Sequence, residues 1–269
     1  MHEKNEIAPE RIREGLKTNF IGQILFHFTE TTSTNDVAKE LAAKGAREGT
    51  VIISESQSLG RGRLGREWVS PRGGIWFSVI LRPKITPKDA PKLTFTAAVV
   101  VAKTIRKMLK LNAEIKWPND VLINGRKVCG ILTETSIKGG TMDFAIVGVG
   151  INANVDVGSF PSYLRNSVTS LKEELEGEVD REKFLRSLLG ELESYYNTFR
   201  RGDFDMILRE WRGLSSFLGT HVEIVSFDEK FGGWAMDVDS EGALIIKLND
   251  GTTRRVVSGD VTLRRHKKE

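Results

Sequence analysis

Arginine and glycine alternate in one short segment, residues 60–66, GRGRLGR. Glycine allows unusual backbone angles and a close approach to a ligand, and arginine presents a planar fork of donors to a carboxylate or phosphate. The segment therefore predicts an anion-binding loop, although a flexible surface loop with solvated arginines has the same composition. Trp68 favours the anion-binding loop, because an indole beside a phosphate site can stack on a nucleobase.

The same letters contain the dinucleotide fingerprint G-x-G-x-x-G. That fingerprint requires a helix directly afterwards and an acidic residue about 20 positions further on. Residues 67–74, EWVSPRGG, cannot sustain a helix, and residues 80–84 contain no acid. A second near-match over residues 148–153 is not followed by a helical pattern either. Both segments disfavour a Rossmann dehydrogenase.

A second group of charged side chains is KWPND, residues 116–120, with Lys127 shortly after it. Such a segment could face an ATP–metal complex, or it could be a turn with a solvated ion pair. Asn124-Gly125 predicts a two-residue hairpin turn, which would bring Asp120 and Lys127 close together. A carboxylate and an ammonium beside an anion-binding loop suit a site that activates a phosphate.

Strands and helices are expected around these segments. The expected strands span residues 24–28, 50–55, 75–81, 114–117, 131–137 and 144–149, with a hairpin over 121–128, and the expected helices span residues 35–44, 92–109, 180–200 and 204–211. Asp180 is the expected N-cap of the third helix, and Ser33, Thr34 or Asn35 that of the first. After residue 215, short strands over 222–227, 233–238, 243–247, 254–257 and 261–264 predict a small barrel. The chain is therefore expected to be α+β, with a mixed sheet rather than a βαβ repeat.

The composition excludes several classes of protein. The 269 residues are 39% hydrophobic and 28% charged, which is typical of a soluble globular protein. Cys129 is the only cysteine, which excludes an internal disulfide and a multi-cysteine zinc site, and the four histidines lack ligand spacing. We find no secretory signal and no apolar run of the roughly 20 residues that a membrane span needs. A net charge of +4 is too small by itself to indicate nucleic-acid binding.

Five strings occur together in an order and spacing that resemble the biotin protein ligase family. They are STN (33–35), GRGRLGREWVSPRGG (60–74), KWPND (116–120), GRKVCGILTE (125–134) and VGVGIN (147–152). The resemblance continues to the C-terminus, where GALII and SGDVTLR resemble the family's terminal barrel. It implies a class II aminoacyl-tRNA-synthetase-like catalytic domain over residues 21–215 and an SH3-like barrel over residues 216–269. Residues 1–20 resemble a linker, so we expect a form without the winged-helix repressor domain of the bifunctional members.

The resemblance implies the activity of a biotin–[acetyl-CoA-carboxylase] ligase. Biotin and ATP, with Mg²⁺, would give biotinyl-5′-adenylate and pyrophosphate. Biotin would then pass to one lysine of a biotin carboxyl carrier domain in a biotin-dependent carboxylase. We expect a cytoplasmic homodimer that binds neither DNA nor a membrane.

The resemblance also implies roles for individual residues. Biotin is expected to contact Ser33, Thr34, Asn35, Gln57, Arg61, Gly62, Arg63, Lys127 and Gly130. ATP is expected to contact Arg63, Arg66, Trp68, Asn119, Asn152, Gly148 and Gly150. The expected catalytic residues are Arg63, Lys127 and Asp120, with Asp120 also as the Mg²⁺ ligand. Arg63 would bind the biotin carboxylate and the adenylate phosphate, and Trp68 would stack on the adenine. Cys129 is expected to pack rather than to act as a nucleophile.

Two other interpretations remain open at this point. Lipoate ligases share the architecture and form a similar acyl-adenylate, although GRGRLGR and KWPND favour biotin. A biotin-responsive DNA-binding repressor is the alternative from another class, and the absence of a winged-helix pattern disfavours it.

Overall fold

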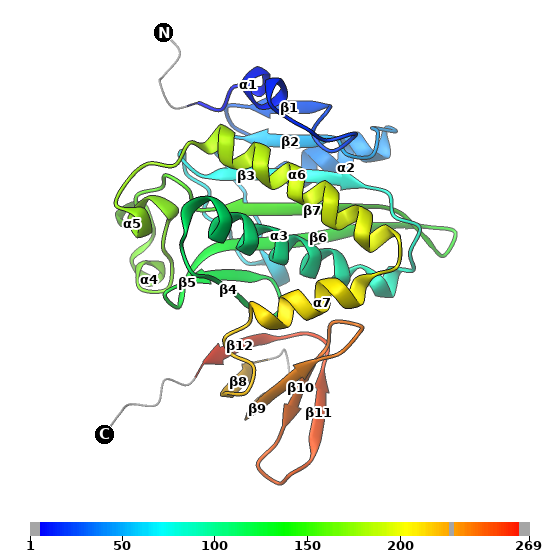
Figure 1. The fold of residues 1–269 in the computed structure, drawn as a ribbon, viewed down its shortest axis with the longest axis vertical. Helices are drawn as coiled ribbons and strands as arrows, with labels where there is room; N and C mark the ends of the chain where they lie inside the picture. The colour runs from blue at the N-terminus through cyan, green and yellow to red at the C-terminus, as the bar shows by residue number, and fades with distance from the viewer. Residues whose placement is uncertain (1–5, 226–228, 264–269) are drawn as a thin grey trace.

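A seven-stranded mixed sheet forms the larger part of the molecule in the computed structural model, which describes residues 6–225 and 229–263 (Figure 1). The strand order is β1-β2-β3-β7-β6-β5-β4. The strands are β1 Leu25–Phe28, β2 Val51–Ser54, β3 Ile75–Leu81, β4 Ala113–Lys116, β5 Asp120–Ile123, β6 Arg126–Lys138 and β7 Thr141–Ile151. The β1–β2 pair is parallel and all other neighbours are antiparallel, so the sheet is mixed as expected.

Helices cover both faces of this sheet. On one face lie α3 Pro91–Leu109, α6 Arg181–Arg200 and α7 Phe204–Gly213, and on the other lies α2 Thr34–Ala43 (Figure 1). Side chains alternate along β2 accordingly: Val51 and Ile53 belong to the main core, whereas Ile52 packs in the smaller core with α2. Because both faces are covered, every residue of β3 is buried.

The segment before β1 packs into the main body. Helix α1, Pro9–Glu14, contacts α6 and β1, and Ile7 and Ile12 lie in the main hydrophobic core. A segment that resembles a linker in sequence is therefore part of the packed structure from residue 7 onward. The proposed domain boundary at residue 20 stays a prediction.

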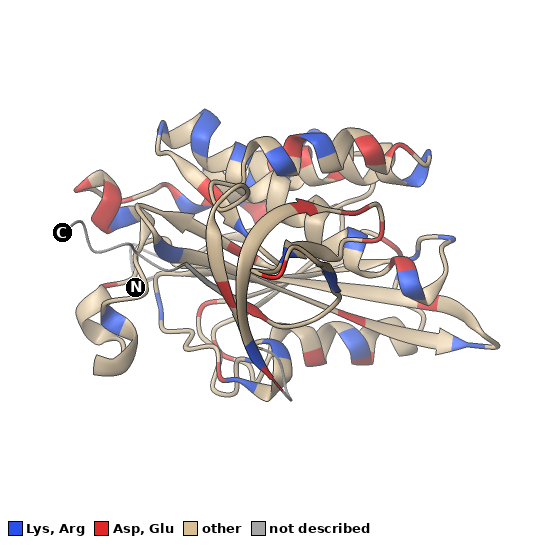
Figure 2. Ribbon diagram, turned by 90° about the horizontal axis from the view of Figure 1, so that it is seen from below, with Lys and Arg blue, Asp and Glu red and all other residues tan. Residues whose placement is uncertain are grey.

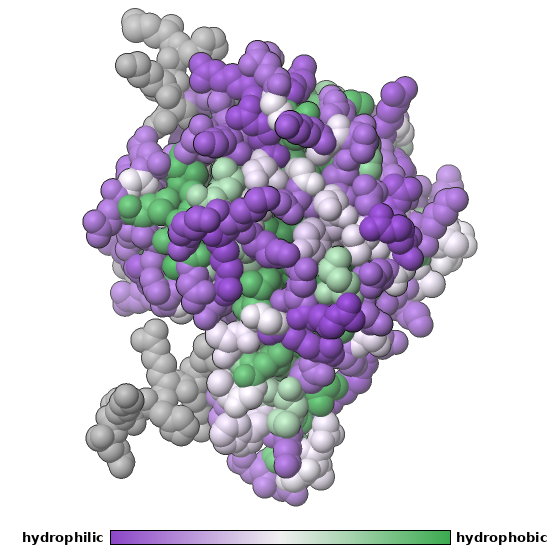
Figure 3. Space-filling model, in the orientation of Figure 1, coloured by the Kyte–Doolittle hydropathy of each residue, from purple (hydrophilic) through white to green (hydrophobic). Residues whose placement is uncertain are grey.

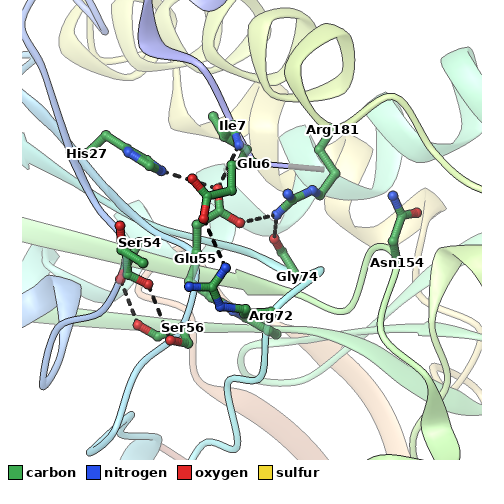
Figure 4. Close-up of polar contacts among 12 residues, drawn as sticks. Glu6, Ile7, His27, Ser54, Glu55, Ser56, Arg72, Gly74, Asn154 and Arg181 are labelled. Atoms are coloured by element: carbon green, nitrogen blue, oxygen red, sulfur yellow. Dashed lines mark hydrogen bonds and ion pairs between the residues drawn. The ribbon is translucent and has the colours of Figure 1, made fainter. Parts of the chain in front are cut away.

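A buried carboxylate ties this N-terminal segment to the sheet (Figure 4). Glu55 accepts hydrogen bonds from the Ile7 backbone N–H at 2.7 Å and from Arg181 Nη1 at 2.9 Å, and His27 Nε2 lies 3.2 Å from its Oε1. The same Arg181 nitrogen donates to the Gly74 carbonyl at 2.8 Å. The cluster thus connects the chain start, the end of β2 and the start of β3.

The C-terminal part forms a separate five-stranded antiparallel sheet, at the bottom of Figure 1. Its order is β11-β10-β9-β8-β12, from β8 His221–Val225, β9 Lys230–Val238, β10 Leu244–Lys247, β11 Thr253–Val256 and β12 Asp260–Leu263. It docks on the larger body through Trp117, whose indole N–H donates to the Gly242 carbonyl at 3.0 Å. The predicted α+β class, a helix-backed mixed sheet plus a small SH3-like β domain, is confirmed.

Several local predictions are confirmed and others differ. Asn124 and Gly125 have φ of 51° and 74°, as a two-residue hairpin turn with both residues left-handed requires. The Asp180 side chain caps α6 by accepting from Lys183 N–H. Ser33 occupies the N-cap position of α2, but its side chain makes no capping hydrogen bond. The short helices α4 Ser162–Arg165 and α5 Leu171–Leu175 were not predicted. Phe227 and Arg264, placed at strand ends by the sequence, lie outside the described residues.

The surface is polar and its charges are mixed. Lys and Arg alternate with Asp and Glu along the covering helices in Figure 2, and hydrophilic side chains occupy most of the face in Figure 3. Within residues 6–225 and 229–263, no helix has the length and apolar character that crossing a bilayer requires.

Candidate active site

One cavity of about 510 Å³ collects the predicted site residues. Its lining includes all of them, namely Ser33, Thr34, Asn35, Gln57, Arg61, Gly62, Arg63, Arg66, Trp68, Asn119, Asp120, Lys127, Gly130, Gly148, Gly150 and Asn152. This volume is in the range of small-ligand sites. The structure thus brings together segments more than 100 positions apart in the chain, although each residue's role stays a prediction.

A hydrogen-bonded network of uncharged groups forms one end of the cavity. Thr34, at the start of α2, donates from its backbone N–H at 2.8 Å and from its hydroxyl at 3.1 Å to Gln57 Oε1. The Gln57 amide donates in turn to Ser70 Oγ at 2.8 Å. These bonds fix which edge of the Gln57 amide is donor and which is acceptor. Uncharged donors and acceptors held in fixed orientations suit a neutral ligand that has its own donors and acceptors.

Asn35 is oriented by Ser78 and Glu134, two residues that were not predicted to act in the site. Its Oδ1 lies 2.6 Å from Ser78 Oγ on β3, and its Nδ2 donates to Glu134 Oε2 on β6 at 2.7 Å. Gly148 is needed beside it, because a Cβ at that position would lie 2.1 Å from Asn35 Oδ1. The letters of the sequence contain no signal for Ser78 or Glu134, since their partners lie 43 and 99 positions away.

The arginine loop presents its three guanidinium groups differently. Arg61 is paired with Asp36, with Nη1 2.8 Å from Oδ2, and Arg66 is paired with Asp260 of β12. Arg63 has no carboxylate within 4.0 Å among the described residues; its Nη1 has only long contacts, 3.5 Å to Asn119 Oδ1 and 3.4 Å to the Gly259 carbonyl.

The Arg63 guanidinium is half-buried and forms no ion pair with any carboxylate of the described residues. Burial lowers the pKa of Arg63, and the nearby charges of Asp260 and Asp120 offset only part of that effect. The group remains a cation, because arginine is not deprotonated in proteins. A half-buried, unpaired cation that faces a cavity is suited to an anionic ligand.

Trp68 lies across two paired glycines of the sheet. Gly130 on β6 and Gly150 on β7 are register partners, and a Cβ on either would come within 3.0 Å of the indole. Lys127 Nζ lies 4.9 Å from the centre of the Trp68 ring, and Trp76 meets its edge. The indole therefore forms part of the cavity wall, with a cation beside it.

The β5–β6 hairpin brings Asp120 and Lys127 together, as predicted. Lys127 Nζ lies 2.6 Å from Asp120 Oδ1, and Lys116 Nζ lies 3.9 Å from Oδ2. Both lysines line the cavity, although only Lys127 was predicted to act there. Asn119 is anchored by donating to the Ile131 carbonyl at 2.8 Å, which leaves its Oδ1 toward Arg63.

The donor set does not suit a magnesium ion held by the protein. No group of three His, Cys, Asp or Glu side chains able to hold a metal occurs within residues 6–225 and 229–263. Asp120, the expected ligand, is already neutralised by Lys127 and lies near Lys116. Magnesium binds proteins through one or two carboxylates together with substrate phosphates. Here the ion would have to arrive on the phosphates of the nucleotide.

A further part of the cavity wall is apolar, and the sequence analysis did not predict it. It is lined by Val69, Phe160, Leu164 and Val168, which cluster with Trp76. Two buried polar atoms near it lack a hydrogen-bond partner among the described residues, Trp68 Nε1 and Asn152 Oδ1. A flat apolar wall with one free donor and one free acceptor is suited to a heteroaromatic ring.

Cys129 is fully buried in the main hydrophobic core, and burial raises the pKa of its thiol. A thiol with a raised pKa is a poor nucleophile. This arrangement supports the expectation that Cys129 packs.

Comparison with known families and proteins agrees with this site. Residues 25–152 match the biotin/lipoate A/B protein ligase family, and residues 217–264 match the biotin protein ligase C-terminal domain. The chain is 36% identical over 259 residues to the bifunctional ligase/repressor BirA of Bacillus subtilis, covering 96% of this chain and 79% of that protein. It is 30% identical to the biotin–[acetyl-CoA-carboxylase] ligase of Mycobacterium tuberculosis, over 97% and 98% of the two chains.

A solved structure gives the same result at the level of the fold. Biotin protein ligase from Aquifex aeolicus in complex with biotin and ATP matches with a TM-score of 0.76 and 27% identity, covering 90% of this chain and 99% of that one. The similarity includes both the mixed sheet and the C-terminal sheet. The chain therefore belongs to the biotin protein ligase family and is a ligase.

Proposed function

We propose that the chain joins biotin to ATP, forming biotinyl-5′-adenylate and pyrophosphate, and then transfers biotin to a lysine of a biotin carboxyl carrier domain. The observation that carries the proposal is that the Arg63 guanidinium, which has no carboxylate within 4.0 Å among the described residues, lines the same cavity as the neutral polar network and the apolar wall. The network and the wall fit the two halves of the adenylate, and the cation fits the charged junction between those halves.

The uncharged end supports the placement of biotin. The ureido ring of biotin is neutral and carries both N–H donors and a carbonyl acceptor. Thr34, Asn35 and Gln57 offer fixed donors and acceptors at this end. The biotin carboxylate then extends toward Arg63 and Lys127.

In the first step, a biotin carboxylate oxygen attacks the α-phosphorus of ATP. A new phosphorus–oxygen bond forms, and the bond to the β-phosphate oxygen breaks, releasing pyrophosphate. Two anions must approach for this to occur, and Arg63 and Lys127 offset their repulsion. The adenine lies on the apolar wall beside Trp68.

In the second step, the acceptor lysine amine attacks the acyl carbon and AMP leaves. The amine must lose a proton, and we assign its acceptance to the Asp120 carboxylate, which lines the cavity in contact with Lys127. No protein nucleophile is needed, since the mixed anhydride reacts directly with the amine.

The C-terminal domain supports biotin over lipoate as the substrate. The model that matches residues 25–152 covers both kinds of ligase, whereas the one that matches residues 217–264 is specific to biotin protein ligases. The curated relatives named above are also biotin enzymes or bifunctional ligase/repressors. Homodimer formation, a cytoplasmic location and the absence of DNA and membrane partners stay predictions from the resemblance.

A direct assay tests the proposal. The protein is incubated with biotin, Mg·ATP and an acceptor domain, and the acceptor is probed with streptavidin. A labelled acceptor, accompanied by pyrophosphate release, is expected. Lipoate in place of biotin serves as the control substrate, and transfer of lipoate without transfer of biotin would contradict the proposal.

A further inference from the structure

A single carboxylate outside the cavity receives hydrogen bonds from three residues of two separate segments. Glu174 lies in α5, beside the end of the sheet where the β5–β6 hairpin turns (Figure 1). Its side chain is only 5% exposed. It accepts from Asn124 Nδ2 at 2.7 Å, from Arg126 Nη2 at 2.8 Å and from Thr169 Oγ1 at 2.7 Å.

Two of these donors belong to the hairpin that holds the charged pair of the cavity. Asn124 is the first residue of its turn, and Arg126 opens β6 directly before Lys127. The turn is what allows Lys127 and Asp120 to meet at 2.6 Å. Glu174 therefore holds the closed end of this hairpin.

The third donor belongs to a segment that binds the Lys127 backbone. Lys127 N–H donates to the Ser167 carbonyl at 2.8 Å, and Thr169 N–H donates to the Lys127 carbonyl at 2.9 Å. Ser167 and Val168 of this segment line the cavity. Glu174 thus bonds both structures that set the position of the Lys127 backbone, while the Lys127 ammonium extends into the cavity.

We propose that Glu174 is a positioning residue that fixes where the Lys127 ammonium lies during adenylate formation. The proposal rests on the proposed function for the role of Lys127. A cation acts on developing charge only when it is held at the correct distance, and a displacement of about 1 Å can reduce a rate about 100-fold. The buried Glu174 carboxylate maintains that distance because it binds both the hairpin turn and Thr169, which hold the Lys127 backbone.

The neighbouring Glu173 provides a matched control. It also pairs with Arg126, with Oε1 2.8 Å from Nη1, but its side chain is 40% exposed. Among the described residues its side chain makes no hydrogen bond or ion pair with Asn124 or with residues 167–169, and its removal leaves Arg126 its bond to Glu174. Glu173→Ala therefore removes a nearby carboxylate but keeps the hydrogen bonds of Glu174 to the hairpin turn and to Thr169.

The first measurement is pyrophosphate release at saturating biotin and Mg·ATP. Glu174→Ala is expected to lower kcat about 10- to 100-fold with little change in KM. Glu173→Ala is expected to stay within about twofold of wild type, as for other surface changes. Glu174→Gln keeps an amide oxygen for Arg126 and Thr169 and should restore most of the rate. A rate for Glu174→Ala equal to that of Glu173→Ala would overturn the proposal.

A double-mutant cycle separates positioning from a general structural effect. If Glu174 acts through Lys127, then Glu174→Ala should lower the rate by only about twofold in a Lys127→Ala background. The full loss in both backgrounds would overturn the proposal. Should Glu174→Ala fail to fold, Thr169→Val removes one donor and is expected to show a smaller loss with the same dependence on Lys127.

The last measurement does not depend on activity. Acylation of Lys127 by an amine-reactive reagent, followed by peptide mass spectrometry, is expected to be faster in Glu174→Ala, because the contact with Asp120 loosens, and unchanged in Glu173→Ala. Equal labelling in all three proteins would overturn the positioning role. If the wild-type protein releases no pyrophosphate, the proposed function is contradicted. The labelling result would still test whether Glu174 positions Lys127, because it does not require activity.

Discussion

Arg63 is the cation of the cavity that no carboxylate neutralises within the described part of the chain. Arg63→Ala removes a donor fork from two anionic groups, each charged hydrogen bond contributing about 1.5–3 kcal/mol. We expect pyrophosphate release to slow by at least about 10-fold. Arg63→Lys keeps the charge but not the fork and should recover only part of the rate. Pyrophosphate release at the wild-type rate in Arg63→Ala would contradict the assignment.

Asp120 and Lys127 are in contact but are expected to act in different steps. Lys127→Ala should slow adenylation, because the cation opposite the developing charge is lost. Asp120→Ala should slow transfer from supplied biotinyl-adenylate more than Lys127→Ala does, since the base for the attacking amine is lost. Single-turnover transfer from the supplied adenylate isolates the second step. Equal transfer rates in Asp120→Ala and wild type would restrict Asp120 to holding Lys127.

At the scale of elements, the Glu55 cluster joins the chain start to β2 and to the residues before β3 (Figure 4). Burial alone would raise the pKa of Glu55, but the hydrogen bond to His27, the charge of Arg181 and the Ile7 N–H outweigh it and lower the pKa. A lowered pKa in the folded state means that this stabilisation is present above the unfolded value of about 4.3 and is lost as the pH falls below it.

Glu55→Gln tests this contribution. The variant replaces the charged Glu55 carboxylate of its buried pair with Arg181 by a neutral amide, so we expect a loss of about 3 kcal/mol in the free energy of unfolding at pH 7. The difference between wild type and variant should shrink as the pH falls below about 4. Urea unfolding at several pH values measures it. Glu6→Gln, in the more exposed pair with Arg72, should change stability by less than about 1 kcal/mol. A difference independent of pH would contradict the account.

Elements with a strong local signal could be predicted from the sequence, and contacts between distant segments could not. Asn124-Gly125 determines a turn by its own backbone preference, and the turn brought Asp120 to Lys127 as predicted. Ser78 and Asp260 carry no such local signal, because their importance comes from Asn35 and Arg66 far away in the chain. The packing of Ile7 and Ile12 could not be predicted for the same reason: these two isolated isoleucines show no periodicity, yet both are buried.

At the scale of the whole molecule, both sheets contribute residues to the surroundings of the cavity. Asp260 on β12 pairs with Arg66, and the Gly259 carbonyl lies 3.4 Å from Arg63 Nη1, so the C-terminal sheet contacts the arginine loop directly. That sheet is held to the body by helix α7, where Arg212 Nε donates to Asp237 Oδ1 at 2.6 Å and Nη2 donates to the Val238 carbonyl at 2.7 Å. We therefore expect the docking of the two sheets and the order of the arginine loop to be coupled.

Arg212→Ala should loosen this docking without touching the cavity. The ion pair is partly exposed, 36% at Arg212 and 50% at Asp237, so we expect a loss of about 1 kcal/mol, or roughly a fivefold increase in the opening of the two sheets. Protease cleavage within residues 214–220 should accelerate accordingly. Because the loop then shields the anhydride less well, biotinyl-adenylate should leak to solvent faster while biotin still binds. Arg209→Ala, an exposed arginine on the same helix, is the matched control and should leave both rates unchanged. Faster cleavage in Arg212→Ala with no change in leakage would show that the C-terminal sheet does not help to close the site.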